Sequence, residues 1–316
     1  MRKRIAFLAG AISFDNQNRV VTGVLKRAAE LNLDVYIFTC FVNYDESEEN
    51  KIGAFRIMEL PDFHTFDGVI VMKNSIQYDK ASDTLIKKIL NSRILAVSID
   101  ENVDGMHNVG ISDYDSQKRI VEHLLEKHHL TKVNYVCGII KYDMPEAIVF
   151  ANDAMAIGAM ERLRQKGYKI PEDILITGFD NDELSEFCVP SLTTVDRMQE
   201  NLGEAAVNLL FDRQPDSCAQ ITTKILYRES CGCSEQTTKT KEDLRVEYQN
   251  KCMIYEEALD ALKSMELDLT GLESVEELCL RLEKYVLRSD MKNFYMCLCD
   301  DKELFAFHDD RKTNIR

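Results

Sequence analysis

The feature that most constrains the fold of this chain is the alternation of two hydrophobic patterns between residue 4 and about residue 180. Short apolar runs alternate with stretches in which apolar residues recur at helical spacing. Most of the runs are almost continuously hydrophobic, as strands are when helices cover both faces of their sheet. The runs are "RIAFLAG", "DVYIFTC", "DGVIVMK", "LAVSID", "VNYVCG", "AIVFAND" and "ILITGFD", and the helical stretches include residues 17–31, 80–91, 114–128 and 154–167. The alternation predicts an α/β fold with doubly wound, largely parallel sheets.

One connection does not fit this pattern. The runs "VNYVCG" and "AIVFAND" are separated only by residues 139–146, whereas a parallel crossover needs roughly a dozen residues or more, usually including a helix. Either the two strands are antiparallel neighbours, or the natural protein carries further residues at this point. We favour the second interpretation.

The net charge and the cysteine content narrow the class of partner and the cellular compartment that we expect. The formal net charge is -15, which disfavours a nucleic-acid backbone or an anionic membrane surface as partner. The start, "MRKRIAFLAGAIS", is similar to a secretory signal, but its removal would take the opening strand from the first βαβ unit. Most of the ten cysteines lie in apolar runs, where cysteine behaves as a small hydrophobe. We therefore expect a reduced, cytoplasmic protein.

Polar side chains follow several of the predicted strands. Because ligands of open α/β sheets bind beyond the carboxyl ends of the strands, these residues are candidates for a binding site. Carboxylates and amides can each hold two neighbouring hydroxyls, and an aromatic ring can stack on a ligand. The set predicts an uncharged, sugar-like or otherwise polar small molecule as ligand. The candidates are Ser13, Phe14, Asn74, Asp100, Asn152 and Asp180.

The dipeptide Asn152–Asp153 stands where a strand passes into a helix with almost no loop. An acid at this point can accept hydrogen bonds from the unpaired N–H groups of the first helical turn. We expect Asp153 to cap the helix and Asn152 to face the cleft.

Catalytic and metal-binding patterns are weak. Asp180 and Asp182 could hold Mg²⁺ for phosphoryl hydrolysis, but hydrolases of that kind place the pair on their first strand. Cys231 and Cys233 form a C-x-C pair that could bind zinc or act as a redox couple. The six histidines show no ligand spacing, so we interpret the cysteines as ordinary thiols and predict no catalytic residue, metal or cofactor.

The composition and the hydrophobic pattern of the sequence change at about residue 234. A polar linker and a long helical segment cover residues 234–270, and Tyr248, Cys252, Tyr255, Leu259 and Leu262 form a short heptad seam in it. The segment is either packed on its own domain or a dimerising signalling helix. Residues 271–316 read as a helix and a hairpin around Asp300–Asp301, too little to close a core, and predict a partial α+β domain.

The stretch from Pro145 to Val195 resembles the effector-binding core of the LacI/GalR repressors, whose fold is that of the periplasmic binding proteins. The resemblance rests on "FANDAMAIGA", "GYKIPEDI", "GFDND" and "PSLTTV", and it extends more loosely from Arg4 to about Cys233. It implies two lobes joined by a hinge. The expected ligand-binding domain covers 1–233, with an N-lobe of about 1–102 plus a return near 220–233 and a C-lobe of about 103–220.

The resemblance also implies roles for single residues. The position of Asp180 commonly binds ligand hydroxyls or amines in the family, and Asn152, Asp100, Ser13 and Phe14 match further cleft-lining positions. The DNA-reading helix-turn-helix of the family precedes the first strand, where this sequence begins, so we expect no direct operator binding. The family also carries a helix and a strand between "VNYVCG" and "PEAIVFAND" that are missing here.

The end of this region and the helix after it resemble bacterial signalling proteins in which such a sensor precedes an output domain, often a GGDEF-type diguanylate cyclase. No GGDEF sequence is present, so a cyclase would lie beyond residue 316. We expect a non-enzymatic sensor that is a homodimer and relays ligand-induced closure. A Mg²⁺-dependent hydrolase using Asp180 and Asp182, or a scaffold that binds no ligand, remain alternatives.

Overall fold

The computed structural model consists of two compact units, Met1–Thr237 and Thr238–Arg316. The residues that the structure describes are 2–42, 47–136, 145–211, 218–233, 241–272, 274–286, 296–300, 303–308 and 311–314. Among them, no helix is both long enough and apolar enough to cross a membrane.

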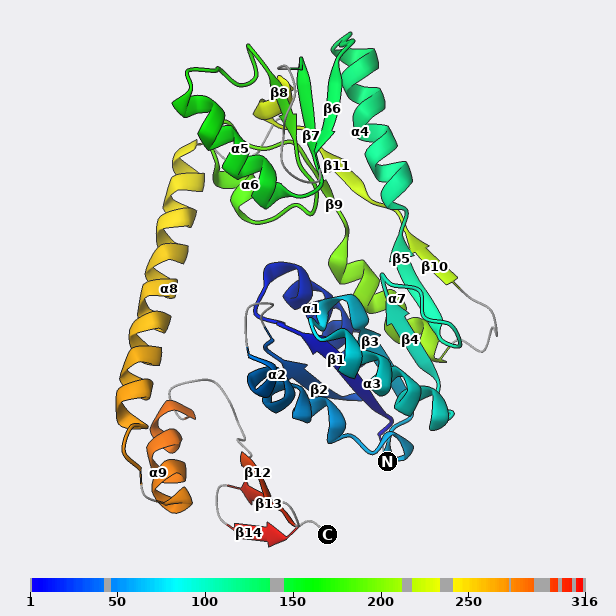
Figure 1. The fold of residues 1–316 in the computed structure, drawn as a ribbon, viewed down its shortest axis with the longest axis vertical. Helices are drawn as coiled ribbons and strands as arrows, with labels where there is room; N and C mark the ends of the chain where they lie inside the picture. Colours follow the sequence, from blue (N-terminus) through cyan, green and yellow to red (C-terminus); the bar gives the residue numbers. More distant parts are fainter. Residues whose placement is uncertain are drawn as a thin grey trace. The chain divides into compact units, whose positions relative to one another are not determined.

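The first lobe of the Met1–Thr237 unit is built on a six-stranded sheet in which every neighbouring pair is parallel (Figure 1). In sheet order the strands are β10 (Cys218–Ile221), β5 (His107–Ile111), β4 (Ala96–Ile99), β3 (Gly68–Met72), β1 (Arg4–Gly10) and β2 (Asp34–Cys40). Its helices are α1 (Asp15–Glu30), α2 (Glu48–Phe55), α3 (Asp79–Asn91) and α7 (Gln199–Phe211).

Both faces of this sheet are buried, as the continuous apolar runs predict. Successive residues of β1 point to opposite faces: Ile5 and Phe7 pack in the core that includes α1 and α7, while Ala6 and Leu8 pack in the core that includes α3. The predicted α/β fold with parallel sheets is confirmed.

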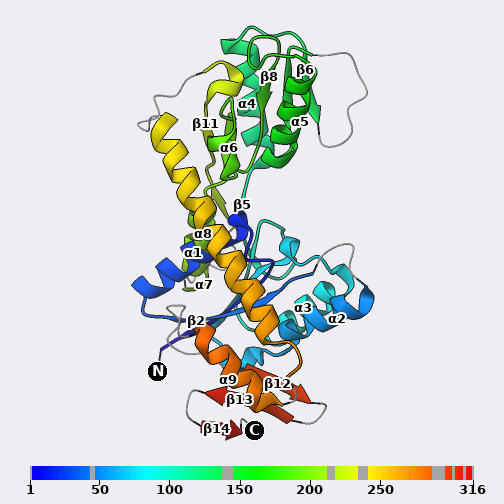
Figure 2. The same cartoon turned by 90° about the vertical axis from the view of Figure 1, so that its left-hand side faces the viewer.

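The second lobe contains the parallel sheet β6-β7-β8 and an antiparallel pair, β9 with β11. Its strands are β6 (Val133–Val136), β7 (Ala147–Phe150), β8 (Leu175–Thr177), β9 (Thr194–Asp196) and β11 (Lys224–Leu226), and its helices are α4 (Asp113–Lys127), α5 (Asp153–Gln165) and α6 (Leu184–Phe187). Figure 2 shows the two lobes from a second direction.

The order of β6 and β7 corrects one expectation. The two strands are adjacent and parallel, with Val133 opposite Ala147 and Val136 opposite Phe150, so the antiparallel alternative is wrong. The short connection lies largely in residues 137–144, outside the described residues.

The segments that return to each lobe also differ from the expected lobe boundaries, which placed residues 103–220 in the C-lobe and a return to the N-lobe at residues 220–233. Helix α7 and strand β10 lie in the first lobe, where α7 packs on α1 and β10 pairs with β5. Residues of the expected return, Ile225 to Cys233, instead pack in the second lobe against α4 and β7. The chain therefore re-enters the first lobe through residues 199–221 and leaves it again before residue 224.

Two glycines allow α1 and α7 to cross at close range. A Cβ atom added to Gly23 would lie 2.0 Å from the carbonyl oxygen of Glu200, and one added to Gly203 would lie 2.2 Å from that of Val20. The backbones therefore approach more closely than any side chain permits. This contact fixes α7, and with it the residues just before α7, against the first lobe.

The Thr238–Arg316 unit contains two helices and a small antiparallel sheet, β12-β13-β14. Its elements are α8 (Lys241–Asp268), α9 (Val275–Val286), β12 (Met296–Asp300), β13 (Glu303–His308) and β14 (Arg311–Asn314). The expected hairpin is present as β12 and β13, whereas the third strand, β14, was not predicted.

The α1–α7 crossing generates a matched pair of predictions. Ala normally stabilises a helix interior by about 0.5–1 kcal/mol relative to Gly. At Gly158 in α5, where no atom lies within 4 Å of an added Cβ, Gly158→Ala should raise the free energy of unfolding by about that amount. Gly23→Ala should lower it, because the two helices must separate. Urea denaturation measures both, and a stabilising Gly23→Ala would contradict the crossing described here.

Candidate ligand-binding site

Arg197 lies between two carboxylates that belong to different lobes. It directly follows β9 and lies two residues before the start of α7. Its Nη2 atom lies 2.9 Å from Oδ1 of Asp100, which follows β4, and its Nη1 atom lies 3.7 Å from Oδ1 of Asp180, which follows β8. Only 16–21% of each of these side chains is exposed, so the ion pairs are weakly screened by solvent. One guanidinium thus contacts both acids, and its single charge offsets one of their two negative charges.

A small pocket lies at the carboxyl ends of the first-lobe strands, beside this arginine. Its volume is about 90 Å³. It is lined by Asn16, Gln17, Val20, Met72, Asn74, Ser75, Asp100, Arg197, Gln199 and Leu202. Four buried atoms of lining residues make no hydrogen bond among the described residues. One of them, Asp100 Oδ1, is ion-paired with Arg197, which leaves Gln17 Oε1, Arg197 Nε and Gln199 Oε1 without a partner. Because an unsatisfied buried polar atom costs roughly 1–3 kcal/mol, these atoms are expected to be satisfied by water or a ligand.

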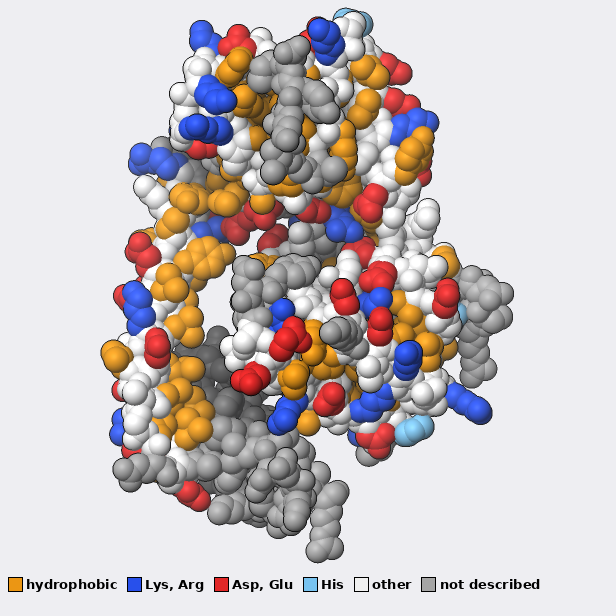
Figure 3. All heavy atoms as spheres, in the orientation of Figure 1, with side chains coloured by type: hydrophobic (Ala, Val, Ile, Leu, Met, Phe, Trp, Pro, Cys, Tyr) orange, Lys and Arg blue, Asp and Glu red, His pale blue; other side chains and the backbone are white. Residues whose placement is uncertain are grey.

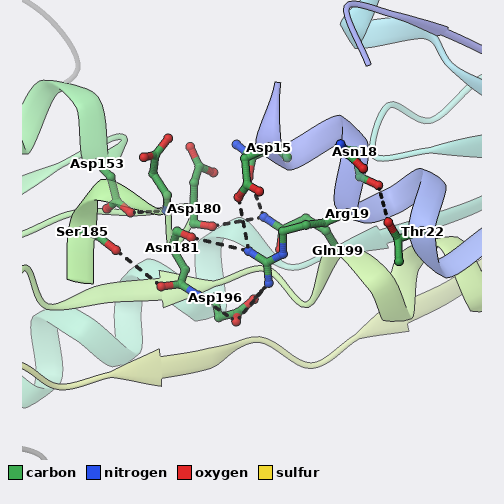
Figure 4. A network of polar contacts seen from close by, with 12 residues as sticks. Asp15, Asn18, Arg19, Thr22, Asp153, Asp180, Asn181, Ser185, Asp196 and Gln199 are labelled. Carbon is green, nitrogen blue, oxygen red and sulfur yellow. Dashed lines mark hydrogen bonds and ion pairs between the residues drawn. The ribbon is translucent and has the colours of Figure 1, made fainter. Parts of the chain in front are cut away.

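Two further contacts connect the lobes around the same point (Figure 4). From α1, Arg19 Nη2 donates to both carboxylate oxygens of Asp196 at 3.2 and 3.3 Å. From α7, Gln199 Nε2 donates to Oδ1 of Asn16 at 2.7 Å and to the carbonyl oxygen of Asp180 at 3.1 Å. In Figure 3, acidic side chains with basic ones among them gather where the two lobes meet.

The backbone at the rim of the pocket is unusual. Asp100, Asp180, Asn181 and Met198 all have positive φ values, of 64°, 107°, 52° and 58°. Such conformations cost non-glycine residues of the order of 1–3 kcal/mol each and cluster at functional sites. Of these four residues Asp100 lines the pocket, and Asp180 contacts Arg197, so part of the strained backbone lies beside the same site.

Burial changes the acidity of Asp180. Desolvation, partly offset by the neighbouring guanidinium of Arg197, raises the pKa of Asp180 to about 6. The carboxylate is therefore largely ionised at neutral pH. Because burial has removed part of its hydration, a further hydrogen-bond donor would stabilise the ionised form. A ligand hydroxyl could supply that donor.

The dipeptide Asn152–Asp153 reverses the roles expected from the sequence. Asn152 is the N-cap of α5, and its Oδ1 accepts from the backbone N–H of Met155 at 2.9 Å. Asp153 is buried, accepts from Thr194 Oγ1 at 2.6 Å and from the backbone N–H of Asp182 at 2.7 Å. The prediction that Asp153 caps the helix while Asn152 faces the cleft is wrong. Asp153 instead fixes the loop that carries Asp180.

The other predicted site residues divide into two groups. Asn74 and Asp100 line the pocket, with Asn74 Nδ2 donating to Oδ2 of Asp100 at 3.4 Å, and Asp180 is joined to them through Arg197. Ser13 and Phe14 are exposed, Phe14 by 59%, and neither lines the pocket. The aromatic stacking role of Phe14 therefore stays a prediction.

Sequence reasoning missed Arg197, Gln199, Asn16 and Gln17. A weak signal for Arg197 was available, because it follows the short stretch "LTTVD", whose threonines and valine are β-branched and favour a strand. The other three lie in helices, and their spacing does not distinguish a residue that faces a pocket from one that faces water.

One cluster of possible metal ligands occurs among the described residues: His123, His128, Cys231 and Cys233, whose ligand atoms all lie within 4.8 Å of one another. Neither the spacing of the histidines nor the C-x-C pair predicted that these four residues would meet, and the interpretation of the cysteines as ordinary thiols stays a prediction. Asp180 and Asp182 do not form such a cluster. Asp180 faces Arg197, and Asp182 Oδ1 accepts from the backbone N–H of Leu184.

Comparison with known proteins places this geometry in context. Residues 104–231 match the family described as the periplasmic binding protein-like domain. The HTH-type transcriptional repressor PurR of Mannheimia succiniciproducens is 44% identical over 71 residues, 22% of this chain and 21% of the repressor. MelR of Bacillus subtilis, also an HTH-type transcriptional repressor, is 28% identical over 155 residues, 47% of this chain and 41% of that protein. The chain thus aligns with about a fifth to two-fifths of the length of these relatives.

Solved structures show the same fold. The lac repressor dimer bound to operator and the anti-inducer ONPF superposes with a TM-score of 0.58 at 18% identity, covering 73% of this chain and 82% of that one. A LacI family regulator from Weissella paramesenteroides with bound sucrose gives 0.59 at 15% identity, covering 72% and 98%. The chain therefore has the periplasmic-binding-protein-like fold that these solved regulators also have, and the relatives it matches in part of its sequence are transcriptional repressors.

The buried carboxyl of Asp153 generates a prediction on pH. Desolvation, opposed by its hydrogen bonds, raises the pKa of Asp153 to about 7 from 3.8, so the folded protein holds this proton at pH values where the unfolded chain has lost it. Its contribution to stability is therefore full at low pH and is lost as pH rises from about 4 to about 7, with a slope of up to ~1.4 kcal/mol per pH unit. Relative to Asp153→Asn, the parent should lose stability across this window in urea denaturation. Parallel profiles would contradict the assignment.

Proposed function

We propose that the Met1–Thr237 unit is a cytoplasmic sensor that binds an uncharged, sugar-like or otherwise polar metabolite between its lobes. The observation that carries this proposal is the pocket beside Arg197, in which buried donor and acceptor atoms stand without partners. We propose no catalytic role for this chain.

The chemistry of the pocket supports a hydroxyl-rich ligand. Arg197 Nε is a donor, while Gln17 Oε1 and Gln199 Oε1 are acceptors. A hydroxyl group donates one hydrogen bond and accepts others, so neighbouring hydroxyls on one ring can satisfy such a mixed set. Two solved proteins of this fold carry sugars, cellobiose and sucrose, in their structures. These are properties of those proteins, and they support sugars as the first class to test.

The size of the pocket indicates how binding would change the protein. At about 90 Å³ it is smaller than the roughly 300–1,000 Å³ of ordinary small-molecule sites. A sugar would enter only with the lobes further apart, and it would then replace part of the polar contacts that Arg197, Arg19 and Gln199 make between them. Since a ligand shifts an equilibrium by its differential affinity for two states, the set of these contacts determines which lobe arrangement the ligand favours.

Helix α8 is the proposed route of output. Hydrophobic side chains lie along it among charged ones (Figure 3), and the heptad residues Tyr248, Tyr255, Leu259 and Leu262 are 44–60% exposed. An exposed apolar seam at heptad spacing is the signature of a helix that pairs with another. We propose that α8 pairs with α8 of a second copy and transmits the lobe arrangement to a domain beyond it.

Ligand binding is tested by calorimetry of the whole chain against mono- and disaccharides, nucleosides, nucleobases and amino acids. For any compound that binds, Asp100→Ala and Asp180→Ala should weaken the affinity at least about tenfold, since each removes a hydrogen bond to a charged group. Asp104→Ala, an exposed acid outside the pocket, is the matched control. If the compound binds all three variants as it binds the parent, the site is wrongly placed. If nothing binds and the dimer is stable, the ligand-free scaffold is favoured.

Pairing through α8 is tested by light scattering. Leu259→Glu puts a charge into the seam and should shift the protein from dimer towards monomer. Ser264→Glu adds the same charge at an exposed position off the seam and should leave the mass unchanged. Equal masses for both variants would show that the dimer, if present, forms elsewhere.

A further inference from the structure

Four side chains with metal-binding atoms meet in the second lobe, away from the pocket. His123 lies in α4 and His128 caps its carboxyl end, while Cys231 and Cys233 lie at and after the short 3₁₀ helix Glu229–Cys231. About a hundred residues separate the two pairs in sequence. All four ligand atoms nevertheless lie within 4.8 Å of one another.

Four of the six separations between the ligand atoms are close to those that a tetrahedral ion imposes, and the other two are at most 4.8 Å. With Zn–N distances of about 2.0–2.1 Å and a Zn–S distance of about 2.3 Å, tetrahedral angles require N···N of about 3.4 Å and N···S of about 3.6 Å. The two imidazole Nε2 atoms are 3.2 Å apart. Cys233 Sγ lies 3.3 Å from Nε2 of His128 and 3.5 Å from Nε2 of His123, and Cys231 Sγ lies 3.8 Å from the latter.

The surroundings hold these atoms in place. Cys231 is fully buried and Cys233 is 9% exposed, within a core formed by Leu124, Val149 and their neighbours. The ring of Tyr227 stacks on His123 with centroids 4.1 Å apart. Thr193 Oγ1 lies 3.0 Å from Sγ of Cys231, where a hydroxyl can donate to a thiolate. Contacts of this kind orient metal ligands in proteins.

Hydrogen bonding alone does not explain the convergence. Each thiol has one weakly donated hydrogen, and each neutral imidazole has one N–H and one acceptor nitrogen. The two Nε2 atoms 3.2 Å apart can share only one hydrogen, and the thiols are weak donors, so hydrogen bonds among the four groups hold them together only weakly. A cation at the centre satisfies all four at once.

We propose that His123, His128, Cys231 and Cys233 bind one Zn²⁺ ion as a closed structural site. Two imidazoles and two thiolates form one of the usual ligand sets of structural zinc, and four protein ligands leave no position for a substrate. Soft sulfur ligands disfavour Mg²⁺ and Ca²⁺, which prefer oxygen.

The site would join two segments that are distant in sequence. It ties the carboxyl end of α4 to the last described residues of the Met1–Thr237 unit, and Cys233 precedes the start of α8 at Lys241. Because metal bound to the folded state adds its binding free energy to folding, zinc stabilises the second lobe and fixes the point from which the chain leaves it.

The test uses the whole chain, purified under reducing conditions without a polyhistidine tag. We expect one zinc per chain by plasma mass spectrometry. Replacement by Co²⁺ should give the visible d–d bands of tetrahedral cobalt together with a thiolate-to-cobalt charge-transfer band. Chelation of the zinc should lower the melting temperature, and added Zn²⁺ should restore it.

Variants separate this site from other thiols and imidazoles. Cys233→Ser and His128→Gln should lose stoichiometric zinc, whereas Cys218→Ser and His129→Gln should retain it, since Cys218 is exposed and His129 lies outside the cluster. Should the site variants fail to fold, alkylation of the parent replaces them. Zinc should protect Cys231 and Cys233 from a thiol reagent while Cys218 reacts freely.

Three results would overturn the proposal. The first is a reduced parent that takes up no stoichiometric zinc or cobalt. The second is full zinc content in Cys231→Ser/Cys233→Ser. The third is equal alkylation of Cys231 and Cys233 with and without Zn²⁺, or a disulfide between them in the reduced, zinc-supplied protein.

Discussion

The guanidinium of Arg197 lies between Asp100 of the first lobe and Asp180 of the second, and the arrangement of the first unit depends on it. At an effective dielectric of about 20, unit charges 4 Å apart interact by about 4 kcal/mol. Without the arginine, two largely buried carboxylates would face one cleft with no compensating charge. The same residue is part of the segment that carries the chain from β9 into α7. Arg197 is therefore part of the backbone segment that crosses between the lobes, and its side chain also forms ion pairs with an acid of each lobe.

Contacts on both sides hold this arginine in position. Gly23 and Gly203 let α7 sit directly on α1, which anchors the chain immediately after Arg197. On the other side, the buried carboxylate of Asp153 binds Thr194 and the backbone of Asp182, which anchors the loop of Asp180. The His₂Cys₂ cluster is close to this loop, because Cys231 contacts Thr193, the residue next to Thr194. Thr193, which contacts the cluster, and Thr194, the first residue of β9, thus connect the cluster to the loop beside the pocket.

Particular residues show how far the sequence could lead. Asp100 and Asn74 were predicted and line the pocket because parallel strands deliver their carboxyl ends to one edge of a sheet. Asn152 and Asp153 were predicted in the reverse roles, since both side chains can cap a helix. The choice was made by Thr194 and Asp182, two partners that are distant in sequence. Ser13 and Phe14 follow a strand as well, yet the chain turns there so that both side chains are exposed.

The sequence by itself determined the α/β fold, the parallel sheets and the edge at which a ligand would be sought, because these follow from hydrophobic periodicity, which is a local property. Tertiary structure alone decided which lobe each returning segment joins, that Arg197 bridges two acids, and that two histidines meet two cysteines. Those outcomes depend on the packing of segments separated by tens to hundreds of residues. No short spacing in the sequence encodes such a meeting.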